Sequence, residues 1–134
     1  MLYNTPVILF VYNRSEHTKQ TIDALRNNEG ADKTDLFIFS DAAKSDNDLR
    51  QVKLVRELIS NVSGFRSVSV VLRPENYGCA RNIIDGVTEI SRKFPQFIVV
   101  EDDIVTSPYF LKFMNQALSF YKNNKKVWNI SGWN

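Results

Sequence analysis

The sequence is poor in the side chains that build disulfides, zinc sites and histidine-dependent triads. Its 134 residues include one cysteine, Cys79, and one histidine, His17. A single cysteine allows no disulfide within the chain, and it is compatible with a reducing compartment. A zinc site of cysteine and histidine from one chain is excluded, as is any catalytic triad that needs a histidine other than His17.

Long apolar runs and strong charge are also missing. No stretch approaches the roughly 18 consecutive apolar residues of a membrane span, and no secretory leader precedes the first apolar run. We therefore expect a cytoplasmic protein, which a membrane-bound acceptor could hold at the inner face of the membrane. The formal net charge is +2 without a dense lysine or arginine run, which argues against a nucleic-acid partner.

The composition that remains is that of one ordinary globular domain. Hydrophobic residues make up 43% of the chain and charged residues 24%, which is enough apolar material for a core. Short apolar runs predict buried strands at residues 6–12, 35–40, 67–72 and 97–100, with a fifth at 127–131. Helical periodicity follows each of the first four runs, and Ser107 and Pro108 predict an N-cap and first turn for the last helix. This alternation indicates an α/β fold with a parallel sheet, right-handed crossovers and helices on both faces.

Three adjacent carboxylates follow the fourth predicted strand. The apolar run Phe97-Ile98-Val99-Val100 stops at Glu101, Asp102 and Asp103. Carboxylates this close repel one another unless a cation or ligand hydroxyls compensate them. Carboxylate oxygens suit Mg²⁺ or Mn²⁺, which often bind one or two carboxylates together with substrate phosphates. A solvated acidic turn is the alternative interpretation of this cluster.

Polar residues also follow the other predicted strands. Asn13 and Arg14 come after the first, Asp41 after the second, and the loop 76–82 after the third. The carboxyl ends of parallel strands share one edge of a sheet, where ligands bind in open α/β folds. A cation, several acids and helix N-termini at that edge suit an anionic ligand bridged by a metal, such as a nucleotide diphosphate.

Four segments together resemble the nucleotide-sugar-binding half of a GT-A glycosyltransferase. They are PVILFVYNR, FIFSD, ENYGCARNIIDGV, which is similar to a segment of family 2 enzymes, and FIVVEDDIVTSPYFLKFM, which resembles the Asp-x-Asp metal motif and its helix. The order of motifs, with SGWN near the end, is most similar to β-1,2-N-acetylglucosaminyltransferases. The resemblance covers essentially all 134 residues.

This resemblance implies a Rossmann-like GT-A fold from which the C-terminal acceptor half is missing. Residues 1–134 would be one nucleotide-sugar-binding domain, truncated from a longer enzyme. The enzyme would transfer a sugar, with inversion, from a UDP-sugar to a glycan or lipid-linked acceptor and would use Mn²⁺ or Mg²⁺. The catalytic base would lie beyond Asn134, and we expect the fragment alone to be weakly active or inactive.

The resemblance also assigns roles to the acidic residues. Asp103 would bind the metal directly, and Asp102 would reach the ribose or a second metal position. Glu101 would lie near the base or ribose. Asp41 would accept the N3–H of uracil.

The remaining site residues would hold the nucleotide and donor sugar. Tyr12 would lie against the base, and Asn13 and Arg14 would bind the nucleotide beside it. Arg81 and Asn82 match family positions near the diphosphate or donor sugar.

Three other functions remain open on the sequence alone. A nucleotidyltransferase usually carries a glycine-rich basic loop after its first strand, whereas residues 12–15 contain no glycine. A receiver-like signalling module places an acidic pair after its first strand and an aspartate after its third, whereas Arg73 follows the third strand here. The last is a non-catalytic binding domain with solvated acids, which metal-dependent nucleotide binding would exclude.

Overall fold

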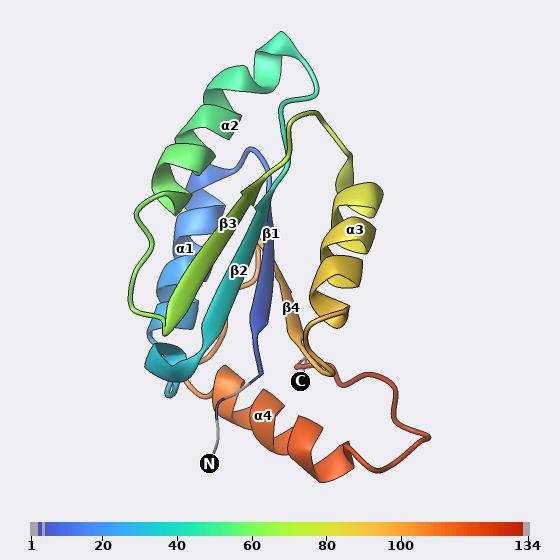
Figure 1. The fold of residues 1–134 in the computed structure, drawn as a ribbon. Helices are drawn as coiled ribbons and strands as arrows, with labels where there is room; N and C mark the ends of the chain where they lie inside the picture. The colour runs from blue at the N-terminus through green and yellow to red at the C-terminus, as the bar shows by residue number, and fades with distance from the viewer. Residues whose placement is uncertain (1–2, 4, 133–134) are drawn as a thin grey trace.

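A computed structural model describes residues 3 and 5–132, in which strands and helices alternate (Figure 1). The elements in chain order are β1 (Val7–Val11), α1 (Ser15–Arg26), the 3-10 turn η1 (Ala31–Lys33), β2 (Asp35–Ser40), α2 (Asp46–Ile59), β3 (Ser67–Leu72), α3 (Cys79–Ser91), β4 (Ile98–Glu101) and α4 (Phe110–Tyr121). The predicted α/β fold class and the first four predicted strands are confirmed.

The four strands form one parallel sheet in the order β3-β2-β1-β4. Val7 of β1 is paired with Leu36 of β2 on one side and with Ile98 of β4 on the other. β1 and β2 are therefore central, and β3 and β4 are the edges of the sheet that the described residues form. Helices α1 and α2 cover one face and α3 covers the other, while α4 lies across the amino ends of the strands (Figure 1).

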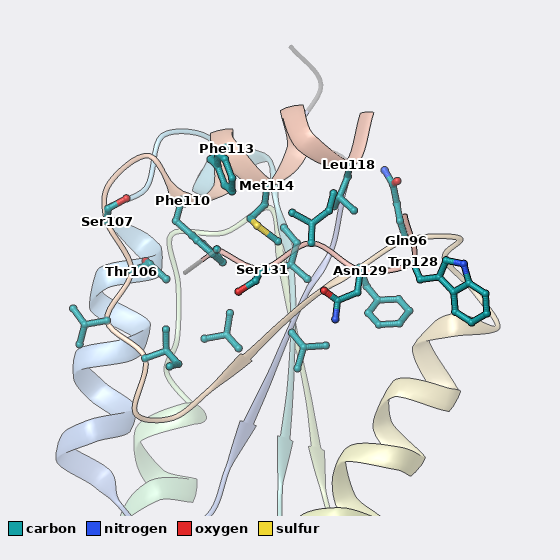
Figure 2. A pocket seen from close by; sticks show the side chains of 18 of the residues that line it. Gln96, Thr106, Ser107, Phe110, Phe113, Met114, Leu118, Trp128, Asn129 and Ser131 are labelled. Atoms are coloured by element: carbon teal, nitrogen blue, oxygen red, sulfur yellow. The ribbon is translucent and has the colours of Figure 1, made fainter. Parts of the chain in front are cut away.

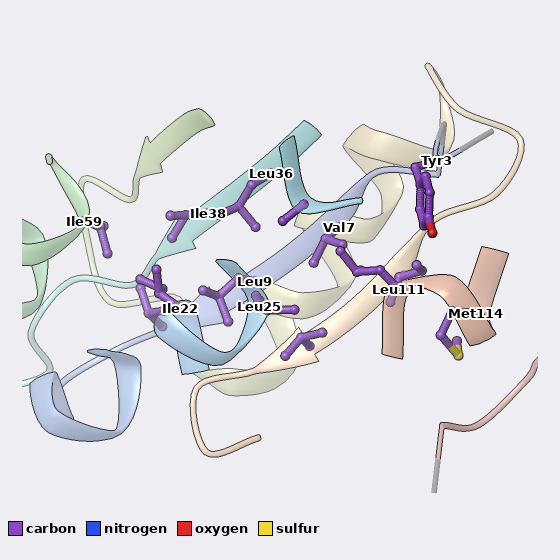
Figure 3. Close-up of a cluster of buried hydrophobic side chains, with 14 of the residues drawn as sticks. Tyr3, Val7, Leu9, Ile22, Leu25, Leu36, Ile38, Ile59, Leu111 and Met114 are labelled. Carbon is purple, nitrogen blue, oxygen red and sulfur yellow. The ribbon is translucent and has the colours of Figure 1, made fainter. Parts of the chain in front are cut away.

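Side chains of β1 alternate between two cores, because successive residues of a strand point to opposite faces. Val7, Leu9 and Val11 pack into the larger core, shown in Figure 3, with residues of α1, α2 and α4. Ile8 and Phe10 point to the α3 side, where they cluster with Phe39, Ile90 and partly buried neighbours. Both faces of β1 are thus apolar, which explains its unbroken apolar sequence.

Helix α3 packs unusually close to the sheet at Gly86. A Cβ atom on this glycine would lie 2.7 Å from Cε1 of Phe10 and 3.3 Å from Cγ of Phe39. The Phe10 and Phe39 rings stack with centroids 5.5 Å apart and occupy that space. The inward face of α3 accordingly runs through Asn82, Gly86 and Ile90, and Ile84 on the same helix is exposed.

Helix α4 begins later than the sequence predicted. Ser107 and Pro108 precede a turn, and the helix starts at Phe110 after Tyr109. A residue distant in sequence fixes this start: Asn28 Oδ1 accepts a hydrogen bond from the Leu111 amide at 2.9 Å, and Asn28 Nδ2 donates to Thr106 Oγ1 at 3.0 Å. The prediction of a Ser107 cap was wrong because a tertiary hydrogen bond replaced a local one.

The predicted fifth strand at residues 127–131 is absent from the described part of the chain. Two hydrogen bonds in this region are local, from the Val127 amide to the Asn124 carbonyl and from Trp128 Nε1 to the Lys125 carbonyl. Trp128 is exposed rather than part of the core. Within residues 3 and 5–132, no helix has the length and apolar character needed to cross a bilayer.

Candidate active site at the carboxyl edge of the sheet

The strand register brings the four strand exits to one edge. Val11 pairs with Ser40, Ser40 pairs with Leu72, and Phe10 pairs with Glu101. The loops that follow these positions contain six of the nine predicted site residues, while Glu101 ends β4 and Arg81 and Asn82 lie in the first turn of α3. The arrangement follows from parallel pairing, since every strand points its carboxyl end the same way.

Arg14 and Asp102 form an ion pair at the junction of β1 and β4. Arg14 directly precedes α1 and Asp102 directly follows β4, and the two strands are neighbours. Arg14 Nη2 donates to Asp102 Oδ1 at 2.5 Å and lies 3.9 Å from Asp103 Oδ2. The hydrogen bond to Asp102 raises the pKa of the Arg14 guanidinium above its ordinary value. The predicted cation and acids therefore do come together.

The three adjacent carboxylates differ in their surroundings. The side chain of Asp102 is 9% exposed and engaged by Arg14, whereas that of Asp103 is 48% exposed. Glu101 is also exposed. The described residues contain no cluster of three or more histidine, cysteine, aspartate or glutamate side chains that could hold a metal ion by themselves. Asp103 instead fits a metal that takes one protein carboxylate, with water and ligand oxygens in its remaining positions.

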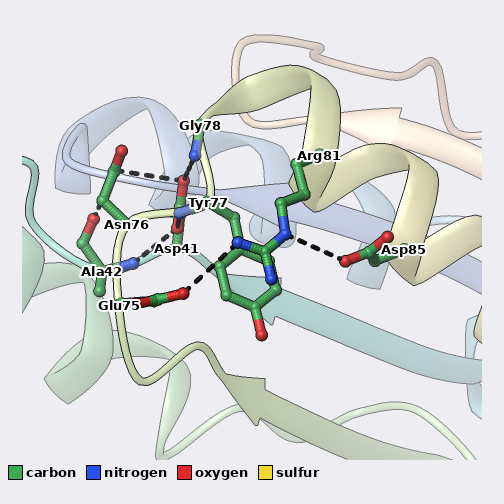
Figure 4. A network of polar contacts seen from close by, with 8 residues as sticks. All are labelled: Asp41, Ala42, Glu75, Asn76, Tyr77, Gly78, Arg81 and Asp85. Atoms are coloured by element: carbon green, nitrogen blue, oxygen red, sulfur yellow. Dashed lines mark hydrogen bonds and ion pairs between the residues drawn. The ribbon is translucent and has the colours of Figure 1, made fainter.

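Asp41 is a buried acceptor at the exit of β2. Its Oδ1 accepts hydrogen bonds from the amides of Ala42 at 2.9 Å and Tyr77 at 2.8 Å. Its Oδ2 accepts from the Gly78 amide at 3.0 Å and from Asn76 Nδ2 at 3.3 Å (Figure 4). A carboxylate has about four acceptor positions, so this set engages all of them.

The Asp41 hydrogen bonds define the loop between β3 and α3. Gly78 has φ of +77° and ψ of 162°, a conformation that is essentially restricted to glycine. Its amide can point at Asp41 because the backbone takes this conformation just before α3. The Asn-x-Gly sequence is the signal for this turn. The contact from Asn76 is the longest of the four and is the one that another donor could replace most readily.

Tyr12 and Asn13 are held by α2. The Tyr12 hydroxyl donates to Asp48 Oδ2 at 2.8 Å and accepts from the Lys44 amide at 3.1 Å. Asn13 Nδ2 donates to Asp48 Oδ1 at 3.2 Å. Burial and the bond to Asp48 raise the pKa of the Tyr12 hydroxyl, so it stays protonated at neutral pH. These contacts fix the ring of Tyr12, half-buried, at the end of β1.

Arg81 lies on the ring of Tyr77 at the start of α3. Its guanidinium carbon is 3.8 Å from the ring centroid. The same guanidinium forms ion pairs with Glu75 at 3.4 Å and with Asp85 at 3.5 Å (Figure 4). The side chain is exposed, so it is accessible to a ligand at this edge but already neutralised by two carboxylates.

Asn82 is not accessible to a ligand in this structure. It is buried, and its Oδ1 accepts a hydrogen bond from Arg73 Nε at 2.9 Å. Arg73 is also buried, with its guanidinium 4.9 Å from the Phe39 ring centroid and 4.8 Å from that of Tyr77. Asn82 therefore makes a buried contact with Arg73 in this structure, and its expected position near the diphosphate or donor sugar stays a prediction.

Several residues that shape this edge were missed by the sequence reasoning. Arg56 Nη2 donates to the Arg73 carbonyl at 2.9 Å, and Arg56 Nε donates to Ser40 Oγ at 3.2 Å, so α2 links the ends of β2 and β3. Such contacts join distant segments, and no local pattern marks them. The sequence reasoning did not single out Asp48 or Arg56; it named Asn76 and Tyr77 only as part of the 76–82 loop, and Arg73 only as the residue after the third strand.

A hollow of about 1150 Å³ lies between the free side of β4, the 104–107 loop, α4 and residues 128–132 (Figure 2). Its walls include Phe113, Met114 and Leu118, and Asp103 is the only charged residue among them. This apolar hollow touches the polar edge only through Asp103. A charged ligand would therefore find its polar partners at the edge rather than in the hollow.

Comparisons with known proteins agree with this fold. The mannosyltransferase PcManGT from Pyrobaculum calidifontis, solved in complex with GDP-Man and Mn²⁺, matches with a TM-score of 0.61 at 18% identity. The match covers 87% of this chain and 32% of that chain, so this chain spans about a third of the mannosyltransferase's length. A likeness at this identity shows the fold. The comparison with curated proteins gave no match.

The family comparison extends over nearly the whole sequence. Residues 2–134 match the GNT-I family, and that family is one of GT-A-like glycosyltransferases. The expected GT-A resemblance is thereby confirmed, and the nucleotidyltransferase and receiver-like alternatives are set aside. By this match, the chain belongs to the GNT-I family.

Proposed function

We propose that this chain binds the nucleotide-sugar donor of a metal-dependent glycosyltransferase, which transfers a sugar from a UDP-sugar to a glycan or lipid-linked acceptor. The observation that carries the proposal is the junction of β1 and β4. There Arg14 engages Asp102 and leaves the Asp103 carboxylate half-exposed beside it. A cation next to an available carboxylate suits a diphosphate bridged to a divalent metal.

Each residue of the edge has a part in this proposal. Asp103 would hold Mn²⁺ or Mg²⁺, and Asp102 would orient Arg14 toward the diphosphate. Tyr12 would lie against the base, with Asn13 beside it. When bound, the metal would supply positive charge that stabilises the departing nucleotide diphosphate.

The uracil preference rests on Asp41. Its carboxylate is held at the end of β2, and a base N3–H could displace the 3.3 Å bond from Asn76. Cytosine has no proton on N3 and could not make this contact. Arg81, on the other side of the loop, would reach the diphosphate or donor sugar by exchanging one of its two carboxylate partners.

Inversion at the sugar carbon is part of the proposal through the resemblance of residues 75–87 to family 2 enzymes. An inverting transfer needs a base that removes the acceptor proton. None of the nine candidate site residues is assigned this role. We expect the 134-residue chain to bind nucleotide and to transfer sugar weakly or not at all.

Titration calorimetry tests the metal and nucleotide parts together. UDP is titrated into the wild-type protein with Mn²⁺ and with a chelator, and then into Asp103→Ala. We expect metal-dependent binding that weakens at least about tenfold in Asp103→Ala, the scale of losses at metal-site positions. Asp32→Ala is the matched control, because Asp32 is an exposed carboxylate of η1, remote from this edge.

Three results would contradict the proposal. One is UDP binding of equal strength with Mn²⁺ and with chelator. Another is a loss of UDP affinity that is equally large in Asp103→Ala and in Asp32→Ala. The third is tighter binding of GDP than of UDP, which would remove the uracil assignment of Asp41 while leaving the metal site intact.

A further inference from the structure

The end of α4 and the turn after it form an exposed aromatic and basic surface, here called the α4 tip. The tip comprises Phe120, Tyr121, Lys122, Lys125, Lys126 and Trp128. Phe120 is 80% exposed and Trp128 is 92% exposed. The chain after α4 loops outward from the body of the domain before it returns toward the sheet (Figure 1), so the tip protrudes.

The aromatic rings of the tip are held in place while remaining uncovered. Phe120 and Tyr121 pack edge to face with centroids 4.9 Å apart. Trp128 Nε1 donates to the Lys125 carbonyl at 3.0 Å, which ties the indole to the turn. The tip therefore presents large apolar faces to its surroundings in a defined arrangement.

Positive charge is concentrated in the same part of the chain. All 15 acidic residues lie at or before Asp103, and four lysines with no acidic residue follow. Lys112 is neutralised by Glu29 at 3.4 Å. Lys122, Lys125 and Lys126 are exposed and form no ion pair within the described residues. The tip is thus locally cationic, although the net charge of the whole chain is only +2.

We propose that the α4 tip binds peripherally to an anionic lipid surface. Tryptophan and tyrosine favour the headgroup region of a bilayer, where one end of the ring is apolar and the other meets water. Lysines beside them are attracted to anionic lipids within a Debye length of the surface. A helix end that carries both kinds of side chain matches an interfacial anchor.

The shape of the tip favours a lipid surface over an acidic protein. A protein or peptide partner generally needs a groove or a flat patch that buries several hundred square ångströms on each side. The nearby apolar hollow is bordered by Trp128 but not by Phe120 or Tyr121. A protruding tip with exposed rings can enter a headgroup layer without such a groove.

The tip lies away from the polar edge. Helix α4 crosses the amino ends of the strands (Figure 1), whereas Asp41 and Asp103 follow their carboxyl ends. Binding through the tip would therefore leave the nucleotide edge uncovered. Membrane binding and nucleotide binding are predicted to be independent of one another.

Vesicle co-sedimentation tests the proposal directly. The probes are vesicles of phosphatidylcholine alone and vesicles of phosphatidylcholine with phosphatidylglycerol. We expect binding to the anionic vesicles only, with a blue shift of tryptophan emission. A Trp133→Phe background leaves Trp128 as the sole tryptophan, because the chain has two.

Two tip variants separate the apolar and electrostatic contributions. Lys125→Glu with Lys126→Glu is expected to lower the vesicle partition coefficient at least about tenfold, given roughly a fivefold effect for each lysine near an anionic surface. Phe120→Ser with Trp128→Ser is expected to lower it by a similar factor. Ile84→Ser and Lys53→Glu are matched controls, since both residues are exposed but lie on α3 and α2. All variants should keep the wild-type circular dichroism and UDP affinity.

Any of five results would overturn the proposal. The first is that the folded wild-type protein binds no vesicles, and the second is that it binds neutral and anionic vesicles equally. The third is that the tip variants and the control variants lose the same amount of vesicle binding. The fourth is a wild-type protein that self-associates while the Phe120→Ser, Trp128→Ser variant is monomeric, which would make the tip an interface between copies. Displacement from vesicles by polyglutamate with unchanged tryptophan emission would likewise identify an acidic polypeptide as the partner.

Discussion

At the scale of single residues, Asp41 is the most densely bonded side chain of the site. It accepts four hydrogen bonds, and three of them come from residues 76–78. This carboxylate organises the β3–α3 loop whether or not it also contacts a base. Its substitution should therefore alter the loop in the absence of nucleotide.

Asp41→Asn is predicted to loosen the β3–α3 loop. The asparagine amide would direct an N–H group at backbone N–H donors, and buried groups left unpaired in this way cost about 1–3 kcal/mol each. We expect faster hydrogen exchange at the Tyr77 and Gly78 amides and weaker UDP binding. Asp32→Asn should change neither. Unchanged exchange at Tyr77 and Gly78 would contradict the role given to Asp41.

At the scale of secondary-structure elements, the contact between α3 and β1 depends on Gly86. The close approach of Phe10 and Phe39 leaves no room for a methyl group. Alanine normally stabilises a helix interior by about 1 kcal/mol relative to glycine. Overpacking of a core usually destabilises by about 1–3 kcal/mol, and here it should outweigh the gain in helix propensity.

Gly86→Ala is therefore predicted to lower the free energy of unfolding, measured by urea denaturation. Phe10→Leu should partly restore it in the double variant, because the smaller side chain vacates the space next to position 86. The double-mutant cycle isolates this coupling. A Gly86→Ala protein more stable than wild type would show that α3 is free to move outward.

The start of β2 is joined to the start of β3 by a charged cluster. Asp35 accepts hydrogen bonds from Arg66 Nε at 2.8 Å and from Ser67 Oγ at 2.6 Å. The bond from Arg66 holds the pKa of Asp35 below its ordinary value, and burial opposes this effect. Because the pKa of Asp35 is lower in the folded state than in the unfolded state, its ionised carboxylate stabilises the fold. This stabilisation is fully present above the unfolded-state pKa of about 3.9, and it is lost as the pH falls through the lower pKa of the folded state.

Asp35→Asn is thus predicted to be less stable than wild type at pH 7, by up to about 1 kcal/mol since Arg66 is half-exposed. The difference should shrink as the pH falls below about 4. Urea denaturation at several pH values measures it, and Asp32→Asn provides the control with no expected difference. A stability difference independent of pH would show that the amide changes packing rather than charge.

At the scale of the whole molecule, the apolar pattern predicted the sheet, while long-range hydrogen bonds decided the details. The runs 7–11 and 35–40 are central strands with largely buried residues on both faces, whereas 67–72 and 98–101 are edge strands that keep exposed positions. That pattern also predicted which loops meet at the carboxyl edge. The meeting of Arg14 and Asp102 follows from it.

Other features depend on contacts between distant segments, which local patterns do not specify. Asn28 sets the start of α4, Asp48 holds Tyr12, and Arg73 buries Asn82. Residues 127–131 have a strand-like sequence, but they have no regular secondary structure and are not part of the sheet. Strand propensity alone therefore did not specify a strand here.

The central claim is that the carboxyl edge of the sheet binds a metal together with a nucleotide. Paramagnetic Mn²⁺ broadens the amide resonances nearest to it, so an NMR spectrum of the labelled protein with UDP locates the ion directly, with Mg²⁺ as the diamagnetic control. The account predicts selective broadening around residues 12–14, 76–78 and 102–104, lost in Asp103→Ala. Broadening centred elsewhere, for instance on α2 or the α4 tip, or none at all with UDP bound, would contradict it.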